Sequence, residues 1–194
     1  MPYNINKTGI FALVLVAAIV ATLCDANHVF TQTLSYPNPL FFQQAWWVFP
    51  AFFIAFLFMA INYLYVSRIL NQKLDIKLST AHGSWRSLFE DLTAFSCVYL
   101  LSGFGNFHPA LLCFIFYLTF IIRLAFTYER GWLCILAISL AIGGMFFEGL
   151  LAEFGLVKYR HADIFNVPYW LGGVYMHGAF ALRSGMRALV YKSA

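Results

Sequence analysis

The sequence has 194 residues, of which 62% are hydrophobic and only 10% are charged, whereas soluble domains average about 45–50% and about 25%. These proportions exclude a disordered chain, a coiled coil and a secreted disulfide scaffold, and the net charge of +4 indicates membrane orientation rather than nucleic-acid binding. We therefore expect an integral membrane protein, of the bacterial inner membrane or the endoplasmic reticulum. Each membrane helix needs about 20 apolar residues, so this length holds about six of them.

Apolar runs separated by polar segments predict six membrane-spanning helices in chain order, at residues 8–29, 46–70, 85–104, 108–128, 131–157 and 167–190. Residues 31–45 contain Tyr36-Pro37-Asn38-Pro39 and are expected to form a turn-rich loop between the first two spans. The predicted fold class is all-α: a polytopic membrane protein whose six helices form one bundle, a single domain over residues 1–194.

The positions of lysine and arginine predict how this bundle is oriented. In a six-span arrangement, every lysine and arginine except Lys158 and Arg160 falls on the same side. Because short loops rich in positive charge stay in the cytosol, both termini should be cytosolic. Residues 25–45, 103–108 and 158–166 should then lie on the opposite, far side. Tryptophans at predicted span ends agree with these boundaries: Trp46, Trp47, Trp85, Trp132 and Trp170.

Two ionisable residues fall deep inside predicted spans. Glu148 lies about ten residues, or about 15 Å of helix, from the far-side end of the fifth span. His177 lies about nine residues, or about 14 Å, from the same side on the sixth span. Because charged groups are costly in hydrocarbon, we expect the two side chains to meet. They form either a structural pair or a ligand-contacting or catalytic pair, and Tyr175 lies beside them in sequence.

Asp25 and His28 place a carboxylate and an imidazole three residues apart at the far-side end of the first span. A metal would need a third ligand, and the four cysteines are not at metal-ligand spacing, so we expect neither a metal nor another cofactor. Glu153 is about 140° around the helix from Glu148, which excludes a carboxylate dyad on one face. Arg123 is expected to extend to the cytosolic headgroups.

The sequence resembles the insulin-induced gene (Insig) family of six-span sterol sensors of the endoplasmic reticulum, together with its bacterial relatives. Four segments carry this resemblance, at residues 44–50 (Gln-Ala-Trp-Trp-Val-Phe-Pro), 127–130 (Thr-Tyr-Glu-Arg), 159–165 and 168–171 (Pro-Tyr-Trp-Leu). It extends over roughly residues 34–187. Phe49 replaces a proline of the family pattern, and Glu129 replaces the aspartate of an Asp-Arg pair. In the animal proteins that acidic position helps to hold a sterol-regulated partner, so the resemblance implies partner binding at Glu129 and Arg130.

The resemblance implies a non-enzymatic protein that binds a lipid, sterol or isoprenoid in a pocket between spans and regulates a partner membrane protein. The polar set of Asp25, His28, Glu148 and His177 is richer than in the sterol sensors, so the ligand need not be a sterol. We predict these ligand-binding residues: Glu148, His177, Asp25, His28, Trp47 and Tyr175.

Two alternatives remain open at this stage. The first is a membrane isomerase, cyclase or hydratase acting on an apolar lipid, with Glu148 as acid and His177 as base. The second is a small structural subunit of a membrane complex, in which the polar residues contact another chain. No phosphate-binding loop, dinucleotide fingerprint, zinc motif or serine nucleophile motif is present in the sequence. The sequence does not specify an oligomeric state.

Overall fold

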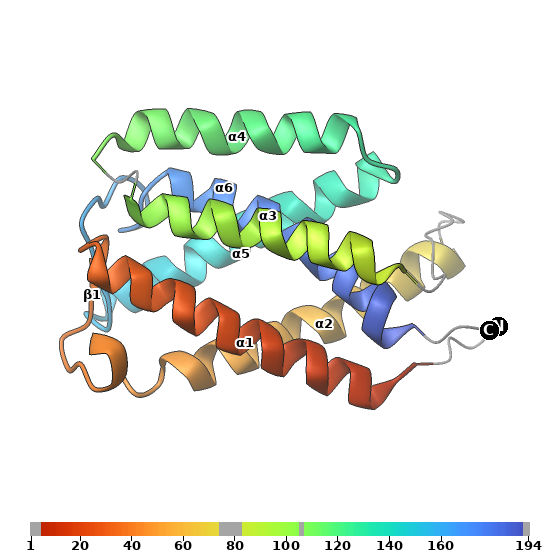
Figure 1. Ribbon diagram of the computed structural model, residues 1–194, viewed down its shortest axis with the longest axis horizontal. Helices are drawn as coiled ribbons and strands as arrows, with labels where there is room; N and C mark the ends of the chain where they lie inside the picture. The colour runs from red at the N-terminus through yellow and green to blue at the C-terminus, as the bar shows by residue number, and fades with distance from the viewer. Residues whose placement is uncertain (1–4, 74–82, 105–106, 192–194) are drawn as a thin grey trace. The chain divides into compact units, whose positions relative to one another are not determined.

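The structure is a computed structural model, and it describes residues 5–73, 83–104 and 107–191. In these residues six α-helices follow one another in chain order (Figure 1): α1 (Lys7–Phe30), α2 (Val48–Lys73), α3 (Trp85–Phe104), α4 (Pro109–Ala125), α5 (Arg130–Glu153) and α6 (Trp170–Gly185). Each helix coincides with one predicted span. The smaller elements are β1 (Leu34–Ser35), the 3-10 helix η1 (Phe41–Gln43), β2 (Lys158–Tyr159) and the π-helical turn η2 (Met186–Val190).

Among the described residues, three helices are long and apolar enough to cross a membrane: Lys7–Phe30, Val48–Leu70 and Arg130–Glu153. A fourth apolar helix, Pro109–Ala125, has 17 residues. The expectation of an all-α integral membrane protein is therefore confirmed. That all six helices span the bilayer and that both termini are cytosolic remain predictions.

Helix α4 shows how these helices pack. It buries Leu112, Phe116 and Phe120, which are four residues apart and so lie on one face. Its outward face is also apolar, with Leu111 and Phe114 exposed. A helix that is hydrophobic on every side suits a lipid environment, because hydrocarbon solvates the outer face as well as protein does the inner one. Helices α4 and α5 are in contact close to the turn that joins them (Figure 1).

The chain divides into two compact units, which we describe separately. Unit 1 comprises Met1–Thr22, Trp47–Asp91 and Ala181–Ala194, and unit 2 comprises Leu23–Trp46 and Leu92–Phe180. The prediction of one domain over the whole chain therefore stays a prediction. Unit 2 contains both predicted carboxylates, Asp25 and Glu148, and is the unit that concerns function.

In unit 1 the start of α1 is tied to η2. Asn6 donates its backbone N–H to the carbonyl of Val190 and its side-chain amide to that of Leu189, over 2.9 and 3.2 Å. The π-helical bond from Tyr191 N–H to Met186 O, at 3.0 Å, forms the wide turn that carries these carbonyls. Gly9 lies against the Leu189 carbonyl, where a Cβ would overlap the oxygen. This close approach therefore requires glycine.

In unit 2 two short strands join distant parts of the chain. β1 pairs with β2 antiparallel, with Leu34 opposite Tyr159 and Ser35 opposite Lys158. Leu34 and Tyr159 are buried in a core with Phe116 and Trp170. The pairing fixes the segment after α1 against the segment after α5. The residues that follow β1 and those of β2 are thereby held beside the same helix ends.

The predicted loop at residues 31–45 has defined structure. After β1 the chain forms η1, and its backbone closes on itself through Leu40 N–H to Gln44 O at 2.7 Å and Gln44 N–H to Phe41 O at 2.8 Å. Phe42 and Gln43 have positive φ angles of 50° and 58°, which reverse the chain direction before α2.

Candidate functional site

Asp25 is buried near the end of α1, where residues of the connection that follows this helix donate hydrogen bonds to its carboxylate. Its carboxylate oxygen Oδ2 accepts a hydrogen bond from the Tyr36 hydroxyl and another from Gln44 Nε2, each at 2.7 Å. Both donors lie outside the helices, one just after β1 and the other just after η1. The connection between α1 and α2 therefore folds back onto the helix that precedes it.

Glu148 is half-buried on α5 and has a matching environment. The hydroxyl of Tyr159 in β2 donates to Oε2 at 2.9 Å, and the hydroxyl of Tyr175 on α6 donates to Oε1 at 3.1 Å. Gly144 lies one turn before Glu148, and a Cβ there would meet the Tyr175 ring. The absence of a side chain at this position thus lets the tyrosine approach the carboxylate.

Asp25 and Glu148 belong to one polar group, because both carboxylates act on the same two phenols outside the helices, those of Tyr36 and Tyr159. Burial raises the pKa of the Tyr36 hydroxyl, and the nearby negative charges of Asp25 and Glu148 raise it further. Burial likewise raises the pKa of the Tyr159 hydroxyl, followed by the charges of Glu148 and, more weakly, Asp25. Both phenols are therefore protonated at neutral pH and donate. We call the following residues the carboxylate–tyrosine cluster: Asp25, Tyr36, Gln44, Glu148, Tyr159 and Tyr175.

His177 is buried on α6 and belongs to a different set of contacts. Arg123 Nη1 donates to its Nδ1 at 2.9 Å, and its Nε2 lies 3.1 Å from the carbonyl of Phe116 and 3.2 Å from Thr119 Oγ1. Because a guanidinium can only donate, Nδ1 must accept, and the imidazole proton is assigned to Nε2. His177 is thus a neutral tautomer that binds a cation.

The predicted pairing of Glu148 with His177 is wrong. Glu148 binds Tyr175, whereas His177 binds Arg123. The two α6 residues are two positions apart, which is about 200° around a helix, so their side chains point in different directions. Depth along two helices carries no information about which way each side chain faces.

Arg123 binds within the protein, and its extension to the headgroups remains a prediction. Its guanidinium donates to His177, with its central carbon 4.2 Å from the ring centre of Phe180. The ring face is negative and attracts the cation. We call Arg123 and His177 the arginine–histidine pair; the ring of Phe180 covers its guanidinium.

His28, predicted beside Asp25, has separate partners. Its Nε2 lies 2.5 Å from Ser102 Oγ, and the Ser102 hydroxyl donates to the carbonyl of Tyr99, so His28 is the donor in the first contact. The imidazole also packs against Tyr99 and the buried Trp170. Among the described residues, no three His, Cys, Asp or Glu side chains are grouped closely enough to hold a metal ion.

The remaining predicted residues lie elsewhere. Trp47 lies directly before α2, in unit 1, and its role in a ligand site remains a prediction. Glu129 adopts a left-handed conformation, with φ of 61°, and its carbonyl accepts from Leu133 N–H at the start of α5. Arg130 and Tyr128 are exposed beside it. These residues form the turn between α4 and α5.

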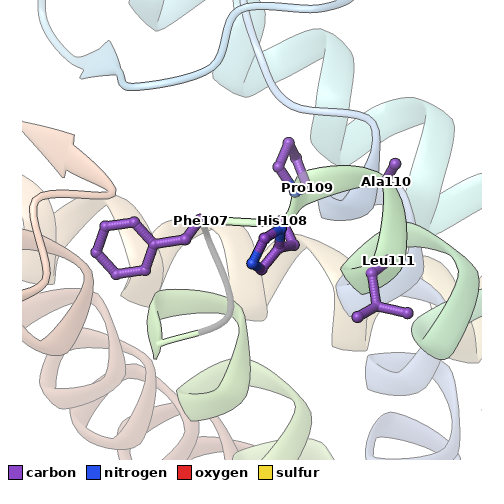
Figure 2. Close-up of a pocket in the computed structure, with 5 residues that line it drawn as sticks. All are labelled: Phe107, His108, Pro109, Ala110 and Leu111. Carbon is purple, nitrogen blue, oxygen red and sulfur yellow. The ribbon is translucent and has the colours of Figure 1, made fainter.

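Among the described residues, the surface of unit 2 includes the following hollows. One, of about 440 Å³, surrounds the start of α4 and is lined by Phe107, His108, Pro109, Ala110 and Leu111 (Figure 2). The other, of about 320 Å³, lies between the end of β1 and the segment that follows α5, and Tyr36 and Lys158 are among its lining residues. Tyr36 connects this second hollow to the carboxylate–tyrosine cluster.

Apolar helices with apolar outer faces, enclosing hydrogen-bonded polar groups, define an all-α integral membrane protein. Its fold is Insig-like. It is similar to the crystal structure of a mycobacterial Insig homolog, MvINS from Mycobacterium vanbaalenii, with a TM-score of 0.74 and 19% identity, covering 95% of this chain and 96% of that one. A cross-linked trimer of an MvINS variant is similar at TM-score 0.73 and 16% identity, covering 96% and 97%. The sequence matches no family model and no curated protein. The resemblance noted in the sequence is therefore confirmed in the fold.

Proposed function

We propose that the protein binds a membrane lipid, of sterol, isoprenoid or diacyl type, and that the carboxylate–tyrosine cluster holds the polar end of this ligand. The proposal rests on one observation: Asp25 and Glu148, which lie on otherwise apolar helices, belong to the same carboxylate–tyrosine cluster. Carboxylates are rare at such places because lipid does not solvate them, and they commonly mark functional sites. The Insig-like fold supports the same class of function.

The chemistry of the cluster favours a ligand that donates a hydrogen bond. Each carboxylate offers more acceptor positions than the two bonds it receives here. A ligand hydroxyl could therefore add to Glu148 or replace Tyr175 as its donor. Aromatic and aliphatic side chains would supply most of the affinity, at about 25 cal/mol per Å² of apolar surface buried. The half-buried Tyr36, at the wall of the 320 Å³ hollow, gives one route to the cluster.

We further propose that the turn between α4 and α5 contacts a partner membrane protein. The exposed aromatic side chains of Phe126 and Tyr128 flank Glu129 and Arg130 there. Exposed aromatic and arginine side chains are typical of protein contact sites. A photoreactive residue in place of Tyr128 should form a cross-linked product of defined mass in native membranes, with a yield that depends on lipid loading. A yield independent of loading would contradict regulation by the ligand.

Mass spectrometry of lipids retained through purification tests the ligand site. Glu148→Gln and Asp25→Asn keep the shape of each side chain but weaken it as an acceptor. We expect each to reduce the retained lipid roughly tenfold, the equivalent of one lost charged hydrogen bond. Glu153→Gln is the matched control, because Glu153 lies on the same helix, is exposed and binds Asn166 outside the cluster.

Equal lipid retention by Glu148→Gln, Asp25→Asn and Glu153→Gln, with all three folded to the same thermal stability, would overturn the site. The acid–base enzyme with Glu148 and His177 is not proposed, because these two residues have different partners in unit 2.

A further inference from the structure

We propose that the connection between α1 and α2 is a membrane anchor whose side chains insert into the lipid interface, rather than a loop in water. We call Leu40, Phe41, Phe42 and Trp46 the aromatic anchor. This inference is independent of the ligand site, because it concerns the outer surface of the segment.

The aromatic anchor presents large apolar side chains outward. Leu40 is 63% exposed, Phe41 73%, Phe42 70% and Trp46 71%. Scattered exposed hydrophobic residues are ordinary, but four large exposed ones within seven positions, interrupted on the surface only by Gln43, form an apolar group that calls for an apolar partner.

The charge distribution of the sequence points to lipid at this place. No Asp, Glu, Lys or Arg occurs between Asp25 and Arg68. The connection between α5 and α6 differs, because it carries Lys158, Arg160 and Asp163. A connection without charges is poorly suited to water but enters the interfacial layer without the cost of burying a charge.

The side chain of Gln44 holds the segment beside the last turns of α1. Gln44 is buried and donates to Asp25, which lies five residues before the end of α1 at Phe30. Five residues correspond to about 7.5 Å along a helix. The segment therefore does not stand away from the helix end but returns beside the last turns of an apolar span. With Gln44 facing inward, the neighbouring phenylalanines face outward.

The backbone of the segment suits a place with little water. The N–H groups of Leu40 and Gln44 are bonded to carbonyls of the same segment, at 2.7 and 2.8 Å. Backbone groups that enter lipid need such internal partners, because the hydrocarbon supplies none.

The helices on either side of the aromatic anchor in the chain identify the occupant as lipid. Both, Lys7–Phe30 and Val48–Leu70, are long and apolar enough to cross a membrane, and Leu23 and Phe30 near the end of the first are exposed apolar side chains. Tryptophan, as at position 46, is enriched at the boundary between headgroups and hydrocarbon. A polar protein partner would not match four uncharged apolar side chains.

Spin labelling in phosphatidylcholine vesicles tests the proposal. A nitroxide is attached at Phe41→Cys, or at Asn38→Cys as the matched control in the same connection, after the four native cysteines are changed to alanine: Cys24, Cys97, Cys113 and Cys134. We expect the label at position 41 to collide with molecular oxygen several-fold more often than with a water-soluble nickel complex. The label at position 38 should show the reverse.

Two results would overturn the anchor. Equal access of the nickel complex to both labels would place position 41 in water, and poor access of both reagents to position 41 would mean that protein covers it. If the cysteine-free chain does not fold, fluorescence of the unmodified chain provides the same test. Subtracting the signal of Trp46→Phe isolates Trp46, and brominated acyl chains should quench it strongly; weak quenching would contradict insertion.

Discussion

Unit 2 holds two polar groups inside apolar helices, and it stabilises them in different ways. The carboxylate–tyrosine cluster holds two acids with neutral phenol and amide donors, three of which lie outside the helices: Tyr36, Gln44 and Tyr159. In the arginine–histidine pair, the Arg123 cation contacts the neutral imidazole of His177 and the ring of Phe180, and all three residues lie on α4 and α6. If the proposed ligand binds, we expect donors carried by short connections to move more readily than groups carried by two helices. We therefore expect the first group to respond to the ligand and the second to contribute to stability.

The largest expected effect is on the helix-borne group. His177→Ala removes one acceptor of Arg123 and leaves a void beside Phe120, so we expect the free energy of unfolding to fall by about 3 kcal/mol. Denaturant titration in detergent micelles measures the change. His108→Ala is the control, because His108 is exposed before α4 and provides no side-chain cap. Equal stability of the two variants would remove the structural role from His177.

A smaller loss is expected in the carboxylate–tyrosine cluster. Glu148→Leu leaves the hydroxyls of Tyr159 and Tyr175 without their acceptor, and two such groups cost about 2 kcal/mol together. Glu148→Gln retains a carbonyl and should lose less than half as much. The same titration compares both with Glu153→Leu. If the leucine variant were as stable as the glutamine variant, the phenol bonds would contribute nothing to the fold.

The smallest effect tests whether the two groups are independent. Tyr159→Phe alone should lower the free energy of unfolding by about 1 kcal/mol. Combined with Glu148→Leu it should show a coupling near that size, since each of the two changes removes the bond between Tyr159 and Glu148. Combined with Thr119→Val, which alters a contact of His177, the effects should add to within about 0.5 kcal/mol. Strong coupling in the second pair would show that the two groups act as one.

Four of the helices, α1, α2, α4 and α5, were predictable because they are apolar runs, and length with hydrophobicity identifies such runs without knowledge of their neighbours. The short elements were not. β1 has two residues, and only Tyr159, more than a hundred positions away, makes Leu34 part of a strand. The π-helical turn at Met186–Val190 lies inside the predicted sixth span, where no residue type marks it.

The site was predictable only in part. Asp25 and Glu148 were found because a carboxylate in an apolar run is conspicuous, and Tyr175 because it lies near His177. Tyr36, Gln44 and Tyr159 are common residues in connecting segments, and nothing in their local sequence indicates a buried partner. The incorrect pairing of Glu148 with His177 came from comparing depth alone. The angle around the helix axis also matters, because the side chains at positions 175 and 177 cannot face the same neighbour.

The bonds between Asn6 and the carbonyls of Leu189 and Val190 have a consequence for biosynthesis. The partners are 183 and 184 positions apart, so α1, which is translated first, cannot complete its contacts until the π-helical turn has been synthesised. During translation the beginning of α1 must wait with exposed amides and with Gly9 uncovered. A chain that ends before position 189 therefore lacks both carbonyls that bind Asn6 in the finished fold.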